Sequence, residues 1–152
     1  MRRSSTIRVL WIAASSACAG GFAAGLTIGI GAVLSAGNLS ANPLSMLFGL
    51  FLLLLSGAVG AIFGTVIGFA PTLLFGLLLT AFRDRAPFSH WVAWALFGGG
   101  MGAVSYWNSL FGLGPNPRQP DWLAAWVAAG AVALATYRRL SFPAAGATGQ
   151  HA

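Results

Sequence analysis

One uncharged stretch decides the fold: residues 9–82 read VLWIAASSACAGGFAAGLTIGIGAVLSAGNLSANPLSMLFGLFLLLLSGAVGAIFGTVIGFAPTLLFGLLLTAF, without a single Asp, Glu, Lys, Arg or His. A water-soluble domain keeps its charged side chains at the surface, so a run of this length cannot cover one. Hydrocarbon is the solvent that penalises charge and therefore favours such a run. The stretch predicts an all-α integral membrane protein.

The apolar segments in and beyond this stretch predict one transmembrane domain over residues 1–140. Its four predicted spans are residues 9–34, 44–82, 88–107 and 122–137. Asn42-Pro43 and Asp121 are predicted to start the second and fourth helices, because Asn and Asp are favoured N-caps and Pro suits the first helical position. The Ala/Gly/Pro-rich tail, residues 141–152, is predicted to be disordered and cytoplasmic.

The second span is long enough to allow two interpretations. As a single helix, residues 44–82 would extend about 60 Å, roughly twice the thickness of the hydrocarbon. Either one helix is kinked or broken near Pro71, where proline removes a backbone hydrogen bond, or two short spans form a hairpin that turns between Ser56 and Gly60.

The arginines decide between these interpretations, because cytoplasmic loops carry an excess of positive charge. Four spans with a cytoplasmic N-terminus place seven of the eight arginines on the inside and only Arg118 outside. The seven are Arg2, Arg3, Arg8, Arg83, Arg85, Arg138 and Arg139. A hairpin would move the last four of these outside. The sequence thus predicts a multi-pass protein of a bacterial inner membrane with both termini in the cytoplasm.

The N-terminal segment has an alternative as a targeting signal. A basic head followed by Ser15-Ser16-Ala17-Cys18 has features of a lipoprotein signal. However, Ser15 stands where a branched apolar residue is usual, and the apolar run continues past Cys18. The segment is therefore predicted to be a retained helix.

Small residues recur at every fourth position and predict glycine-zipper packing, in which helix backbones approach closely. In the second span they are Ser56, Gly60, Gly64, Gly68, Thr72, Gly76 and Thr80; in the first, Ala13, Ala17, Gly21, Gly25 and Gly29; in the third, Ala95, Gly99 and Ala103. The glycines predicted to pack are Gly21, Gly25, Gly29, Gly60, Gly64, Gly68 and Gly99. Four residues turn about 400°, so the stripe drifts around its helix. The second span is therefore predicted to meet more than one neighbour and to be the central helix.

The glycine cluster Gly98-Gly99-Gly100-Met101-Gly102 in the third span has two interpretations. A helix break there could expose carbonyl groups to an ion, as in transporters. Close contact with the second span is the favoured explanation, because no carboxylate or Asn lies nearby in the sequence.

The chain lacks the residue patterns of most chemistries. Apart from Cys18, no ionisable side chain lies in the predicted membrane core, because Asp84, His90 and Asp121 fall at the interfaces. No His, Cys or carboxylate cluster suits a metal or haem. Arginines at segment ends do not form a nucleic-acid stripe. One interfacial cluster, with Arg83, Arg85 and His90 beside Asp84, is predicted to meet lipid headgroups; its alternative is a topology anchor with a local Arg–Asp pair.

These observations predict a non-enzymatic protein without cofactor or metal, whose partners are the bilayer and either further copies or a larger membrane complex. The leading hypothesis is a subunit or accessory of a membrane assembly. The alternative is a small homo-oligomeric channel or transporter with a path between protomers. A lipid-modifying enzyme is disfavoured by the absence of a polar cluster.

Overall fold

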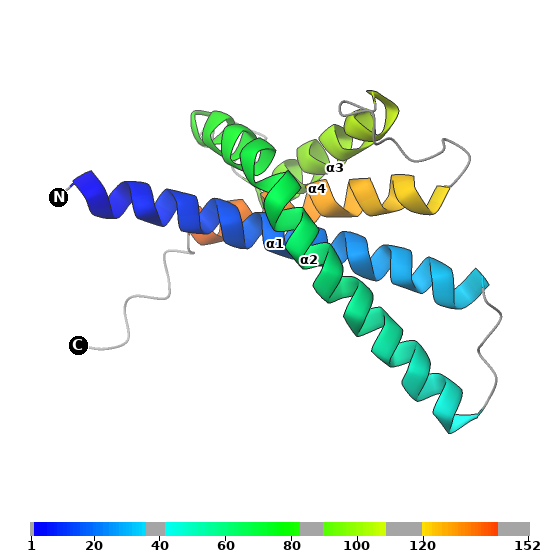
Figure 1. Ribbon diagram of the computed structural model, residues 1–152. Coiled ribbons are helices and arrows are strands. Elements are labelled where there is room, and N and C mark those ends of the chain that lie inside the picture. The colour runs from blue at the N-terminus through cyan, green and yellow to red at the C-terminus, as the bar shows by residue number, and fades with distance from the viewer. Residues whose placement is uncertain (1, 36–41, 83–89, 109–119, 143–152) are drawn as a thin grey trace.

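The computed structural model describes residues 2–35, 42–82, 90–108 and 120–142. Over these ranges all regular secondary structure is helical, in the order α1 (Arg2–Ser35), α2 (Pro43–Thr80), α3 (Trp91–Asn108) and α4 (Pro120–Ser141) (Figure 1). The prediction of an all-α chain is confirmed. Within the described residues, Thr6–Ser35 of α1 and the whole of α2 are long and apolar enough to cross a membrane.

The helix boundaries follow local chemistry, and several of them differ from the sequence prediction. Asn42 is the N-cap of α2, as predicted: its side-chain oxygen accepts a hydrogen bond from the backbone N–H of Leu44 at 3.1 Å, and Pro43 follows at the first helical position. Helix α1 begins at Arg2, so the basic head is helical. Helix α4 begins at Pro120, which places Asp121 in its first turn instead of at the N-cap. The predicted tail lies largely outside the described residues.

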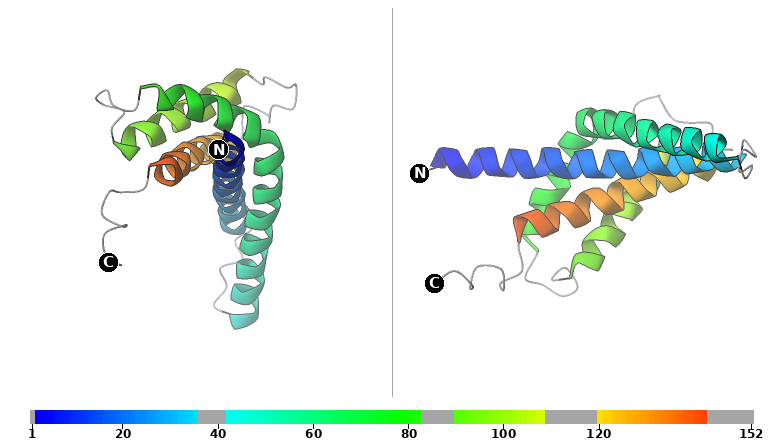
Figure 2. Two further views of the ribbon diagram at one scale, coloured as in Figure 1. Left: turned by 90° about the vertical axis from the view of Figure 1, so that its left-hand side faces the viewer. Right: turned by 90° about the horizontal axis from the view of Figure 1, so that it is seen from below.

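Helix α2 is one continuous helix of 38 residues, so the hairpin alternative is wrong. Its ribbon bends sharply in the green part, between residues 60 and 80, and the two arms run in clearly different directions (Figure 2). Pro71 lies inside this part of the helix. Proline has no N–H to donate and its ring crowds the preceding turn, which is a recognised cause of sharp helix bends.

The central helices are α1 and α4, not α2 as the sequence predicted. Helix α1 packs along both α2 and α4, and α3 packs on α4, whereas α2 makes only a small contact with α4. Most of α2 is exposed, and its buried residues are Gly57, Thr72, Gly76 and Leu79. The stripe of small residues on α2 does contact two neighbouring helices. However, α2 runs along the outside of α1 and then reaches the end of α4, so it is not central.

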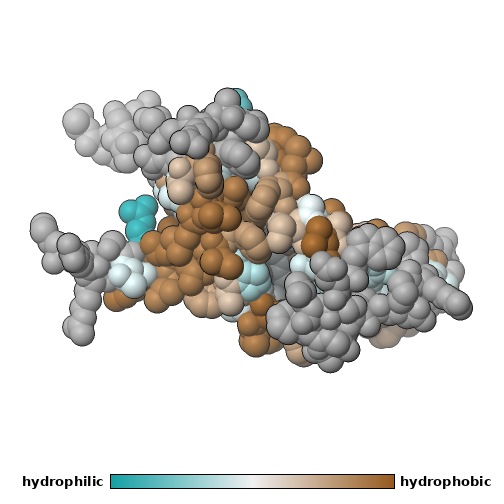
Figure 3. Space-filling view, turned by 90° about the horizontal axis from the view of Figure 1, so that it is seen from above, coloured by the Kyte–Doolittle hydropathy of each residue, from teal (hydrophilic) through white to brown (hydrophobic). Residues whose placement is uncertain are grey.

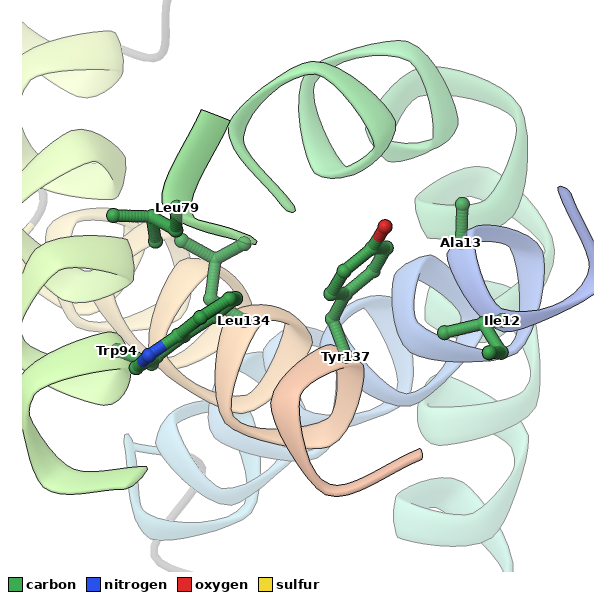
Figure 4. Packing of buried hydrophobic residues seen from close by; sticks show 6 residues of the cluster. All are labelled: Ile12, Ala13, Leu79, Trp94, Leu134 and Tyr137. Carbon is green, nitrogen blue, oxygen red and sulfur yellow. The ribbon is translucent and has the colours of Figure 1, made fainter. Parts of the chain in front are cut away.

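A hydrophobic cluster joins all four helices at one end of the molecule, which we term the closed end. The cluster consists of Ile12, Ala13, Leu79, Trp94, Leu134 and Tyr137 (Figure 4). The rings of Trp94 and Tyr137 stack with centroids 6.3 Å apart, and Phe75 of α2 meets Phe97 of α3 edge to face at 6.0 Å. Aromatic pairs in these geometries add stability beyond the area they bury.

Trp94 provides a test of this cluster, because its side chain is fully buried (0 % exposed). We expect Trp94→Ala to lower the free energy of unfolding by about 3–5 kcal/mol, since it leaves a large cavity between α2, α3 and α4. Trp91, one turn away and 61 % exposed, supplies the matched control. Thermal unfolding in detergent measures both, and equal effects of the two substitutions would contradict the cluster's role.

The bend in α2 is testable through Pro71. We expect Pro71→Ala to straighten the helix, because alanine restores the missing N–H and removes the ring. Spin labels at the exposed residues Leu47 and Leu78, in a Cys18→Ser background, report the distance between the two arms. That distance should increase in the variant; an unchanged distance would mean that tertiary contacts alone produce the bend.

Candidate functional site

The α1–α2 interface is built from glycines whose backbones touch. A Cβ added to Gly21 would overlap the carbonyl oxygen of Gly60, and one added to Gly64 would overlap the Cα of Gly21. A Cβ on Gly25 would likewise overlap the carbonyl oxygen of Ser56. No side chain fits between the helices at these positions. Glycine is therefore a steric requirement here, in the manner of small-residue helix packing.

One hydrogen bond crosses this interface. The Ser56 hydroxyl donates to the carbonyl oxygen of Gly25 over 2.6 Å. The bond forms because the missing side chain of Gly25 brings the carbonyl of α1 within reach of α2. In a membrane setting, interhelical hydrogen bonds of this kind contribute about 0.6 kcal/mol on average.

On either side of these close contacts, the packing at the glycines is less tight, and the last glycine of the α2 stripe contacts α4 instead of α1. A Cβ on Gly29 would lie 3.1 Å from Leu53 Cδ2, and one on Gly68 would lie 3.6 Å from the Ala17 Cβ, an ordinary contact. Further along α2, a Cβ on Gly76 would lie 2.6 Å from the Tyr137 ring of α4. The stripe thus faces α1 first and α4 last.

The α3–α4 interface also depends on glycine, but not mainly on Gly99. A Cβ on Gly98 would overlap the Gly130 carbonyl oxygen, and one on Gly102 would overlap the Trp126 carbonyl oxygen. At Gly99 the nearest atom would be Val127 Cγ1, at 3.4 Å. The glycine cluster therefore packs against α4, and the prediction that it packs against α2 is wrong. Gly98 and Gly102 have the same spacing as Ala95, Gly99 and Ala103, so spacing alone does not separate the two faces.

An apolar groove separates α2 from the α3–α4 pair. Its volume is about 560 Å³, and residues of all four helices line it. The glycine-rich face of α1, which includes Gly20 and Ala24, forms one side of the groove. Phe75 reaches the closed end of the groove, where it pairs with Phe97 across α2 and α3. Ser105 and Trp122 lie at the other end, which we term the open end.

The groove offers little polar chemistry. Its lining includes the hydroxyl groups of Ser56, Thr72 and Ser105 and the indole of Trp126. Within the described residues, no buried side-chain nitrogen or oxygen lacks a hydrogen-bond partner, and no three His, Cys, Asp or Glu side chains gather as metal ligands. An arrangement of this kind suits the binding of an apolar group.

The predicted headgroup cluster falls mostly outside the described residues. Arg83 and Arg85 lie there, while His90 is exposed directly before α3. Cys18, the single cysteine, is exposed on α1. Neither His90 nor Cys18 lines the groove.

Comparison of the chain with protein-family models, curated proteins and solved structures finds no match.

The backbone contact at Gly64 can be tested with a single substitution. We expect Gly64→Leu to destabilise the protein by about 1–3 kcal/mol or more, because the new side chain must displace the backbone of α1. Gly100→Leu is the matched control: a Cβ at Gly100 meets nothing within 4 Å, and leucine favours a helix by nearly 1 kcal/mol over glycine. Thermal unfolding and yield in detergent measure both variants. Equal behaviour of the two would contradict the steric requirement.

Proposed function

We propose that this chain is a non-enzymatic multi-pass membrane protein that acts as a subunit or accessory of a membrane assembly. The observation that carries the proposal is the exposed apolar surface of α2. Large side chains such as Leu44, Phe63 and Val66 are more than half exposed on this helix. Where Figure 3 is coloured, the surface is mostly brown, with a smaller number of white to teal residues among the brown ones. Such a surface is unfavourable in water and favourable against lipid or a partner helix.

Helix lengths support four spans. Helix α3 has 18 residues and α4 has 22, which correspond to about 27 Å and 33 Å. The hydrocarbon is about 30 Å thick. Because α3 and α4 run antiparallel and pack closely through Gly98 and Gly130, the pair suits a hairpin that crosses the bilayer twice. The arginine distribution then supports cytoplasmic termini and an inner-membrane location.

The hydroxyl groups of the long helices support the same setting. Ser16, Thr27 and Thr65 each donate to the carbonyl oxygen four residues earlier, over 2.6–2.8 Å. These bonds satisfy the hydroxyl groups inside the helix, as a hydrocarbon environment demands. The apolar lining of the groove does not suit a water-filled path through one copy, so the accessory role is preferred to a channel within the protomer.

The proposed topology is testable with reporter fusions. We expect fusions at Ala86 and at Ala152 to report the cytoplasm, because both sites then share a side with seven of the eight arginines. A fusion at Asn116, between α3 and α4, is the control and should report the opposite side. A periplasmic signal at Ala86 would reject the four-span arrangement.

The proposed assembly role is testable by purification of the tagged full chain in a mild detergent, followed by native mass measurement. Stable co-purification with a different membrane protein supports the accessory role. A pure homo-oligomer that conducts ions in planar bilayers would reject this role and support the alternative of a channel between protomers.

A further inference from the structure

The groove between α2 and the α3–α4 pair is a space that the described helices do not fill. Its volume of about 560 Å³ lies within the range of about 300–1,000 Å³ that is usual for ligand sites. We infer that it binds one acyl chain of a phospholipid from the outer leaflet. The inference rests on the membrane location proposed above, but not on the identity of any protein partner.

The length of the groove matches the depth of one leaflet. Along α4 the lining extends from Trp122 to Leu134, which corresponds to about 18 Å at 1.5 Å per residue. One leaflet of the hydrocarbon is about 15 Å deep, half of roughly 30 Å. The groove therefore has the length that one acyl chain of a single leaflet occupies.

The chemistry of the groove gives the chain an orientation. Its closed end is apolar and aromatic, with Phe75 and Leu134, and Phe75 packs edge to face on Phe97 of α3. Its open end carries the Ser105 hydroxyl group and the Trp122 indole. Trp is enriched at the level of lipid headgroups. An amphiphile therefore enters with its methyl end toward Phe75 and its ester groups near Ser105 and Trp122.

Glycine keeps this space open. Gly68 lines the groove, and a Cβ there would meet only the Ala17 Cβ, at 3.6 Å. A larger side chain at Gly68 therefore extends into the groove without displacing a backbone, unlike one at Gly64. Gly68→Leu is the substitution that fills the site.

The experiment uses the full chain in vesicles of phosphatidylethanolamine and phosphatidylglycerol, with a trace of phosphatidylcholine that carries a photoreactive diazirine on one acyl chain. Illumination cross-links the lipid to nearby residues, and mass spectrometry maps them. We expect label in the groove, at Met101 and Trp126, and on the outer surface, at Ile62 and Leu96. These last two side chains are 66 % and 72 % exposed and do not line the groove.

Gly68→Leu should lose most of the groove label and keep the outer label. Gly100→Leu, the matched control on the open face of α3, should keep both. An unchanged groove label in Gly68→Leu would overturn the inference. Groove residues without label in the wild-type chain, beside a labelled Ile62 and Leu96, would also overturn it and would indicate a partner helix or second copy in the groove. Absence of label at every position would reject the membrane location as well.

A second measurement needs no variant. A diazirine near the methyl end of the chain should label Phe75 and Leu134, and one near the ester should label Ser105 and Trp122. Labelling that does not depend on the position of the probe would overturn the inference, because it would show unordered lipid.

Discussion

The backbone contact between α1 and α2 is the constraint on which the rest of the structure depends. Gly21 and Gly25 of α1 meet Gly60 and Gly64 of α2 so closely that no Cβ fits between them. In the proposed membrane setting the solvent is as apolar as the side chains, so burial alone does not hold helices together. Close van der Waals packing and the bond from Ser56 to Gly25 must supply the association. Such packing requires flat, small-residue faces on both helices.

The second constraint is the division of the molecule into a closed and an open end. Bulky aromatic residues such as Trp94 and Tyr137 hold all four helices together at the closed end. Toward the open end, α1 pairs with α2 and α3 pairs with α4 through contacts that depend on glycine, and α1 also packs on α4, where Gly20 lies against Ala129. The bend in α2 connects the two regions, because it carries Gly76 onto Tyr137 after the helix has crossed α1. Large side chains at one end and glycines at the other leave the apolar groove between the pairs.

The polar groups of the described helices are consistent with the proposed role. The hydroxyl groups of Ser16, Thr27 and Thr65 bond to carbonyls of their own helix, and Ser56 bonds to α1. In the described part of the chain no titratable cluster lines the groove. The outer surface is apolar, and these hydroxyl groups have hydrogen-bond partners within the protein. This combination suits a protein that binds lipid and other helices, which is the basis of both proposals.

The sequence by itself determined the helical class and several local features. The absence of charge over residues 9–82 favours helices with internally bonded backbones in the proposed membrane setting, and Asn42-Pro43 specifies the start of α2 through side-chain and ring geometry. Pro71 marks the part of α2 that bends, and the period of four marks the faces on which α1 and α2 meet. Only the tertiary structure decided that α1 and α4 are central, that Gly98 and Gly102 face α4, and that a groove remains between the pairs. Periodicity identifies a face of one helix, but it does not name the helix that packs against it. Consecutive glycines suit several faces equally well, so the choice between them depends on which neighbouring helix presents a small residue in register, as Gly130 of α4 does for Gly98.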